Sequence, residues 1–152
     1  MEAKGSPLSL APDTNRPVYT LGVASQLAEI PTHSIRQYID EGLLIPFKLE
    51  SKRHLFSHND INRLKLIREL IQEKGLNFAG VRTLMAMIPC WALRGCSGSD
   101  HHSCDAYTEN FKPCWMASNK GSLCKNDNCR NCEVYLSLDR DAGIKTVLNT
   151  LL

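Results

Sequence analysis

The sequence predicts a mainly α chain in which a winged helix-turn-helix precedes a small loop-rich module, held by a metal or cluster, and a short C-terminal helix. Three observations lead to this prediction. Apolar residues recur at helical spacing through most of residues 20–88. Residues 43–56 interrupt that pattern with a proline, a polar centre and apolar ends, as a β-hairpin would. All seven cysteines fall between Cys90 and Cys132.

The chain divides into four parts by composition. Residues 1–17 are rich in Pro, Ser and Ala without periodicity and are interpreted as a flexible arm. Residues 18–88 form the predicted winged helix-turn-helix, 89–136 the cysteine-rich module and 137–152 an amphipathic helix. No apolar run approaches the roughly 20 residues of a membrane span. The N-terminus also lacks the apolar core of a signal peptide, so we expect a cytoplasmic protein.

Two short helices with a tight connection open the predicted fold. Thr20 is the expected N-cap of the first helix, and Val23, Ala24, Leu27 and Ala28 share one of its faces. Two short helices joined in this way are typical of a helix-turn-helix.

The second helix is expected to begin after Pro31 and to stop at Gly42. Ile35, Tyr38 and Ile39 lie on its inward face by spacing. Its outward face carries four polar side chains: His33, Ser34, Arg36 and Gln37.

The predicted hairpin and two further helices complete this half. Ser57–Asp60 resembles a capping box with Asp in the usual place of Glu or Gln, and it starts a third helix that Gly75 ends. Asn77 caps a fourth helix, which Pro89 stops. The hairpin places basic side chains near its tip: Lys48, Lys52, Arg53 and His54.

Three stretches, "YTLGVASQLAEIPTHSIRQYIDEGLLIP", "RHLFSHNDINRLKLIREL" and "KGLNFAGVR", resemble the MerR family of transcription regulators. The similarity covers about residues 19–88 and is greatest to the heat-shock-repressor branch, which has a similar GLNxAGVR stretch. It implies that residues 32–41 are a recognition helix in a DNA major groove. It also implies that the wing lies on the flanking backbone or in the minor groove.

Arg36 and Tyr38 match the arginine and the second tyrosine of the family's RYYE stretch, which implies DNA contacts, mostly to the backbone. An arginine fork suits phosphate or guanine, and a tyrosine hydroxyl reaches phosphate. Gln37 and Ile39 depart from that stretch, and His54 stands where the family usually has arginine. Tyr38 has a second interpretation as a core residue. The predicted DNA-binding residues are Thr32, His33, Ser34, Arg36, Gln37, Tyr38, Lys52, Arg53 and His54.

The basic surplus is small. Residues 1–88 carry 11 Lys and Arg against 9 Asp and Glu, whereas residues 89–152 carry 7 against 7. Because phosphate contacts supply much of the affinity for DNA, so small a surplus predicts a homodimer that binds two half-sites.

The cysteine-rich module contains an internal repeat. Cys96, Cys104 and Tyr107 map onto Cys124, Cys132 and Tyr135 with one offset of 28 residues, and Cys90-Trp91 maps onto Cys114-Trp115 with an offset of 24. Cys129 has no cysteine counterpart, because His101 stands opposite it. Clustered thiols in a reducing compartment favour metal binding over disulfides, and so little apolar material needs a further source of stability.

The pattern "PCWALRGC…CDAY…KPCWMASNKGSLC…CRNCEVY" resembles a small module of the two-CW type, found mainly in proteins of anaerobic bacteria. The similarity covers about residues 89–136 and includes all seven cysteines. It says little about activity.

An iron–sulfur cluster, [4Fe–4S] in particular, is favoured over zinc, because the cysteine spacing is irregular and only Cys129 and Cys132 form a CxxC pair. Either one cluster takes four of the thiols, or each half-module holds one site. One such site would be Cys90, Cys96 and Cys104 with His101, and the other, which we favour, is the second cysteine set. That set is Cys114, Cys124, Cys129 and Cys132.

Taken together, the sequence predicts a homodimeric, DNA-binding transcription regulator, not an enzyme, whose module senses redox state, oxygen, nitric oxide or a metal. The C-terminal helix is expected to contribute to the dimer, and RNA polymerase is a further candidate partner. Two alternatives stay open: a structural zinc module used for dimer or protein contacts, and an electron carrier tethered to DNA.

Overall fold

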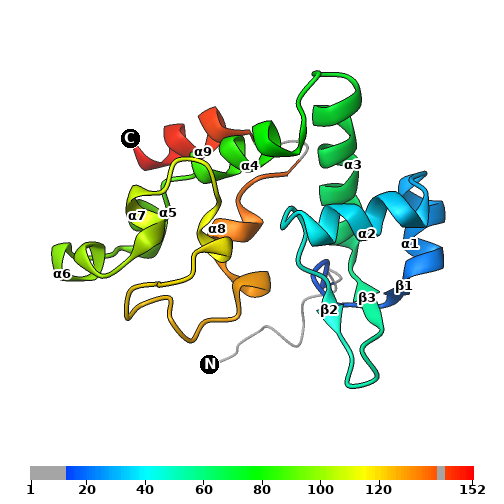
Figure 1. The fold of residues 1–152 in the computed structure, drawn as a ribbon, viewed down its shortest axis with the longest axis horizontal. Coiled ribbons are helices and arrows are strands. Elements are labelled where there is room, and N and C mark those ends of the chain that lie inside the picture. Colours follow the sequence, from blue (N-terminus) through cyan, green and yellow to red (C-terminus); the bar gives the residue numbers. More distant parts are fainter. Residues whose placement is uncertain (1–12, 140–142) are drawn as a thin grey trace, which may run out of the picture.

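The computed structural model describes residues 13–139 and 143–152. It is mainly α with a small sheet, as predicted (Figure 1). The first half contains four helices and three short strands in this order: β1 (Tyr19–Thr20), α1 (Leu21–Ala28), α2 (Thr32–Asp40), β2 (Phe47–Lys48), β3 (His54–Phe56), α3 (His58–Gln72) and α4 (Phe78–Ala86).

The second half is loop-rich, and most of its helices are one or two turns long. Within the described residues, every helix of the chain is too short or too polar to cross a membrane. The elements of this half are α5 (Cys90–Arg94), α6 (Gly98–His102), α7 (Asp105–Thr108), η2 (Cys114–Met116), η3 (Cys129–Asn131), α8 (Glu133–Leu136) and α9 (Ile144–Leu151).

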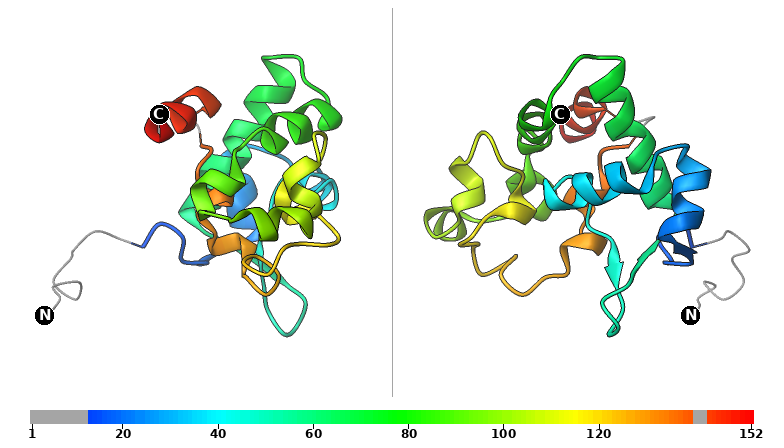
Figure 2. Two further views of the ribbon diagram at one scale, coloured as in Figure 1. Left: turned by 90° about the vertical axis from the view of Figure 1, so that its left-hand side faces the viewer. Right: turned by 45° about the vertical axis from the view of Figure 1, so that its right-hand side comes forward.

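The sheet has three antiparallel strands in the order β1-β3-β2. Phe47 lies opposite Leu55, which confirms the predicted hairpin, and Tyr19 lies opposite Phe56. The hairpin extends away from the helices (Figures 1 and 2). The sequence analysis missed β1, because a two-residue strand is too short to show an alternating pattern.

The predicted helix caps are present. The Thr20 and Asn77 side chains accept hydrogen bonds from the backbone N–H groups of Val23 and Gly80. Ser57 and Asp60 form the reciprocal capping box at α3. These caps fix where α1, α3 and α4 begin, because they satisfy backbone donors that have no partner within the helix.

The single apolar face predicted for α1 is only half right. Ala24 and Ala28 are buried, whereas Val23 and Leu27 are 40% and 44% exposed. Residues four apart share a helix face, and the small alanines let α1 approach α2 and α3 closely. The larger apolar residues therefore point to solvent.

One hydrophobic core joins the two halves. Ile35, Phe56 and Leu64 belong to it together with Val134 and Leu138 of the second half. The cysteine-rich module therefore has a source of stability besides a metal, because its last residues pack into the core of the helix-turn-helix. The boundary between residues 88 and 89 stays a prediction from composition.

Both chain ends differ in part from expectation. Residues 1–12 and 140–142 lie outside the described residues, but the end of the predicted arm is held, since Thr14 O accepts a hydrogen bond from Asn59 N at 2.8 Å. The C-terminal helix begins at Ile144, whereas the predicted helix spans residues 137–152. Its Ile144 packs against the common core, where the sequence suggested no place for it.

Gly42, just after α2, is restricted by its backbone and by a close neighbour. Its φ is +79°, and a Cβ atom here would lie 2.5 Å from Sδ of Met116. Gly75 has nearly the same φ, +77°, and nothing within 4 Å of such an atom. Comparing substitutions at Gly42 and Gly75 therefore separates the cost of backbone strain, which both positions share, from the cost of a clash with Met116, which only Gly42 has.

Replacing Gly42 by alanine is expected to lower the free energy of unfolding by about 2–5 kcal/mol, against about 1–2 kcal/mol for Gly75→Ala. Both variants carry the cost of a left-handed alanine, and only the first displaces Met116. Urea denaturation of both variants measures the difference. Equal losses would show that Met116 moves away without cost.

Candidate functional site

The outward face of α2 and the wing form one groove. His33, Arg36 and Gln37 are exposed, and Thr32 and Ser34 are partly buried. The groove runs between the start of α1, the exposed side of α2 and the hairpin. It is lined by Thr20, Leu21, Gly22, Arg36, Ile39, Asp40, Lys52, Arg53 and His54.

This groove joins predicted site residues from two elements. Arg36 comes from the helix, and Lys52, Arg53 and His54 come from the wing. Lys52 adopts a left-handed conformation, with φ of 70°, at the turn of the hairpin. Three fixed positive charges outnumber the one carboxylate in this groove, that of Asp40, and the imidazole of His54 lies beside them, so the groove suits a polyanion.

Tyr38 differs from the other predicted DNA-binding residues. It is 5% exposed, and its ring packs edge-on against Phe78 at 6.1 Å. Burial raises the pKa of its phenol, an effect that Arg68 partly offsets. Tyr38 is thus a core residue, in line with its second interpretation.

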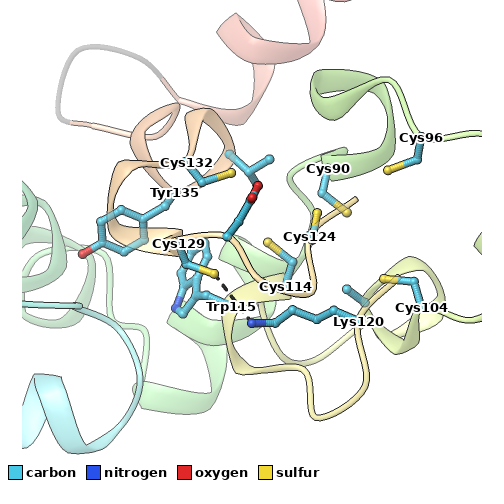
Figure 3. Close-up of a pocket in the computed structure, with 13 residues that line it drawn as sticks. Cys90, Cys96, Cys104, Cys114, Trp115, Lys120, Cys124, Cys129, Cys132 and Tyr135 are labelled. Atoms are coloured by element: carbon cyan, nitrogen blue, oxygen red, sulfur yellow. Dashed lines mark hydrogen bonds between the residues drawn. The ribbon is translucent and has the colours of Figure 1, made fainter. Parts of the chain in front are cut away.

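All seven cysteines line one cavity (Figure 3). The cavity is narrow, with a volume of about 30 Å³. The thiols come from α5, η2, η3 and the loops between them. A bound group in so narrow a space would touch several thiols at once.

Cys90 and Cys114, the cysteines of the two CW pairs, meet inside this cavity. The hydrogen bond between their side chains lowers the pKa of Cys90 to about 7, against the opposing effect of burial. The same bond, together with burial, raises the pKa of Cys114. One of the two thiols is therefore ready to act as a thiolate near neutral pH, the form that binds metals.

Two cationic side chains also reach the sulfur atoms. Lys120 Nζ donates a hydrogen bond to Cys129 Sγ at 3.6 Å (Figure 3). Arg94 is hydrogen-bonded to Cys124 and paired with Asp127. Positive charge beside sulfur favours thiolate and offsets the charge of a thiolate-bound metal group.

The thiols are spread around the cavity rather than gathered at one point. Within residues 13–139 and 143–152, no three Cys, His, Asp or Glu side chains are grouped so as to hold a single metal ion. Zinc with four thiolates needs sulfur atoms roughly 3.8 Å apart, from bonds of about 2.3 Å in a tetrahedron. Cluster ligands stand farther apart, because they bind the corners of a larger body.

His101, the fourth candidate ligand of the first half-module, stacks on Tyr107. Its ring is 3.9 Å from that of Tyr107 at an interplanar angle of 7°. Its Nε2 is buried without a hydrogen-bond partner among the described residues. A smaller adjoining cavity is lined by His101 with Cys90, Cys96, Cys104 and Cys124.

The sequence repeat is also a structural repeat. Cys104 and Cys132 each stand directly before a one-turn helix, α7 and α8, that carries the tyrosine. Each tyrosine meets the tryptophan of its own unit edge-on: the ring centroids of Trp91 and Tyr107 are 5.3 Å apart, and those of Trp115 and Tyr135 are 5.0 Å apart. The units interlock, since α5 packs on α8 and α7 on η2.

The second unit forms side-chain hydrogen bonds to the backbone of the helix-turn-helix. Trp115 Nε1 donates to Gly42 O at 2.8 Å, and the Tyr135 hydroxyl accepts from Ile45 N at 2.8 Å. The guanidinium of Arg63 lies over both rings, 3.8 Å from the Tyr135 centroid. Trp115 thus serves both as a packing residue and as a hydrogen-bond donor.

Sequence reasoning missed the buried arginines. Arg63 and Arg130 are 5% and 4% exposed, although arginine is seldom fully buried unless paired. The position of Arg130 between the two cysteines of a CxxC pair was the available signal. It did not suffice, because the partners of Arg130 are distant in sequence.

Comparison with known proteins finds similarity for the first half. Residues 19–88 match the family model described as MerR HTH family regulatory protein. The heat shock protein HspR of Streptomyces coelicolor is 33% identical over 82 residues, 54% of this chain and 53% of that protein. The HTH-type transcriptional regulator GlnR of Bacillus anthracis is 32% identical over 71 residues, 47% of this chain and 54% of that protein. The chain thus spans about half the length of these curated relatives.

Proposed function

We propose that this chain, whose residues 19–88 are a MerR-family helix-turn-helix domain, binds double-stranded DNA as a transcription regulator and carries an iron–sulfur cluster in its cysteine-rich module. The observation that carries the proposal is one cavity lined by all seven thiols and packed on the helix-turn-helix. When bound, the cluster would supply sensitivity to redox state, oxygen or nitric oxide.

DNA binding is supported by the family match and by the groove. Arg36 and the wing residues Lys52 and Arg53 converge there with exposed charge. Phosphate contacts of this kind would set the register of α2 in the major groove, where His33 and Gln37 reach base edges.

A cluster is preferred over a zinc ion because the cysteine spacing is irregular, and the cations beside the thiols would favour either bound group. Lys120 and Arg94 stand against Cys129 and Cys124, two members of the set that we favour as ligands. Hydrogen bonds and positive charge at the sulfurs are among the means by which a protein tunes a cluster. The remaining thiols, Cys90, Cys96 and Cys104, would be left for redox chemistry or a second site.

The test is a measurement of iron, zinc and acid-labile sulfide on protein purified without oxygen, with an absorption spectrum before and after air. About four iron and four sulfide per chain, with an absorption band that bleaches in air, would support the proposal. Zinc at about one or two per chain, colourless and unaffected by air, would overturn the cluster and leave the structural zinc module.

Arg36→Ala is expected to weaken DNA binding by about 1–3 kcal/mol, because an exposed arginine on the recognition helix is lost while the core is untouched. Fluorescence anisotropy would measure this on a duplex selected by the wild-type protein from a random-sequence pool. Lys65→Ala, on α3, is the control and should bind as the wild type does. Equal binding by the Arg36 variant would contradict the assigned face.

Three further predictions accompany the proposal. The protein is expected to be a cytoplasmic homodimer, with Leu148 and Leu151 on the exposed side of α9 as candidate dimer contacts. RNA polymerase stays a candidate partner. We expect regulation rather than catalysis, and turnover of a redox substrate would favour the tethered electron carrier instead.

A further inference from the structure

The segment between the recognition helix and the wing, residues 42–45, is held by side chains far away in the sequence. We call it the connector. Four of its backbone polar groups form hydrogen bonds to such side chains, three of them from the second cysteine unit. The bonds are Trp115 Nε1 to Gly42 O, Arg63 Nε to Leu43 O, Ile45 N to Tyr135 Oη, and Arg130 Nη1 to Ile45 O.

Arg130 makes the most extensive of these connections. Its Nη1 donates to Ile45 O at 2.7 Å and to Asp60 Oδ1 at 3.0 Å, and its Nη2 pairs with Asp60 Oδ2 at 2.8 Å. Asp60 is itself part of the cap of α3, since its Oδ2 accepts from Ser57 N. One buried guanidinium thus joins the connector after α2 to the start of the helix that follows the wing.

The other end of Arg130 is fixed by the cysteine site. The residue lies in the single 3-10 turn η3, between Cys129 and Cys132, and both of these cysteines line the thiol cavity. Asn131 of the same turn accepts a hydrogen bond from Asn15 Nδ2 at 2.7 Å. Because η3 is only three residues long, a shift of the Cys129 or Cys132 sulfur would also move the Arg130 guanidinium, unless the hydrogen bonds of Arg130 break.

We propose that Arg130 is a positioning residue that transmits the state of the cysteine site to the connector and so sets the angle between recognition helix and wing. This inference rests on the proposed function. Binding or loss of a metal group at Cys129 and Cys132 changes where η3 sits. The recognition helix and the wing must fit one DNA duplex together, so a shift of the connector changes affinity without any change in the residues that touch DNA.

The test compares DNA affinity of anaerobically purified protein with that of the same protein after metal removal by a chelator under reducing conditions. The duplex is one selected by wild-type protein from a random pool. We call the affinity before metal removal divided by the affinity after it, or the inverse if that is larger, the affinity ratio. For the wild type this ratio should be roughly 5 to 150, and for Arg130→Met it should fall below about three. Arg130→Lys, which keeps the charge but loses the fork, should restore part of the ratio.

Arg82→Met is the matched control. Arg82 donates to Glu41 Oε2 at 2.7 Å, just after the recognition helix, and within residues 13–139 and 143–152 both of its side-chain hydrogen bonds go to Glu41. This variant should keep the wild-type ratio even if its absolute affinity falls. A full wild-type ratio in Arg130→Met, with metal content and circular dichroism unchanged, would overturn the inference.

Tyr135→Phe keeps the inference testable if Arg130→Met does not fold. It removes only the hydroxyl that accepts from Ile45 N, and the ring keeps its contact with Trp115. Its ratio should also fall, and an unchanged ratio would count against transmission through the connector. A wild-type protein whose affinity ignores metal removal would instead overturn the proposed sensing, a result distinct from a failure of the variants.

Discussion

Replacing Asp60 by alanine is expected to lower the free energy of unfolding by about 3–5 kcal/mol, because it leaves the buried guanidinium of Arg130 without its charge partner. The side chains of Arg130 and Asp60 are 5% and 3% exposed, and each Asp60 carboxylate oxygen contacts one nitrogen of the guanidinium. The variant also loses the carboxylate half of the capping box at α3. Urea denaturation at a fixed metal content measures the loss.

Glu41→Ala is the matched control. Glu41 also pairs with an arginine, Arg82, but the two side chains are 35% and 22% exposed. An ion pair this exposed contributes about 0–1 kcal/mol. If Asp60→Ala cost no more than this control, Arg130 would have to reach water or another partner when Asp60 is absent.

Cys132→Ser is expected to lower bound iron by more than about tenfold, since even partners outside the metal ligands change metal affinity by 10- to 100-fold. Cys132 packs against the common core and starts α8, whose Val134 and Tyr135 are buried, so it is held in place before any metal binds. Iron and sulfide per chain, measured without oxygen, provide the readout.

Cys96→Ser is the control for this prediction. Cys96 follows Gly95 at the end of α5 and lies across the cavity from Cys129 and Cys132 (Figure 3). It belongs to the first half-module and lies outside the set of cysteines that we favour as ligands. If the Cys96 variant lost iron and the Cys132 variant kept it, the cluster ligands would instead be assigned to Cys90, Cys96 and Cys104.

Local signals predicted the helix-turn-helix well. The caps at Thr20, Ser57 and Asn77 and the stops at Gly42 and Pro89 each depend on residues only a few positions apart. Such short-range chemistry can be read from a sequence, because the partners are already neighbours in the chain. The exposure of Val23 could not be predicted from the sequence, because the face that a helix buries depends on which elements pack against it.

The repeat in the cysteine-rich module was also visible in the sequence, but its consequences were not. The offset of 28 residues paired Cys104 with Cys132, and both begin a one-turn helix with a tyrosine. It did not reveal that the two units interlock around one cavity, or that the second unit is hydrogen-bonded to the helix-turn-helix. The hydrogen bonds to the helix-turn-helix join residues 70 or more positions apart, such as Trp115 and Gly42.

The sequence by itself determined the helix-turn-helix half and the presence of seven thiols, because helical periodicity, capping and cysteine spacing are properties of short stretches. Only the tertiary structure decided what the thiols are connected to. In the sequence, Arg130 is one residue between two cysteines and gives no sign of its partners. In the fold its guanidinium is shielded from water and therefore needs hydrogen-bond acceptors, which Asp60 and Ile45 supply. That requirement is met only in the folded chain, where the cysteine turn lies against the connector between recognition helix and wing.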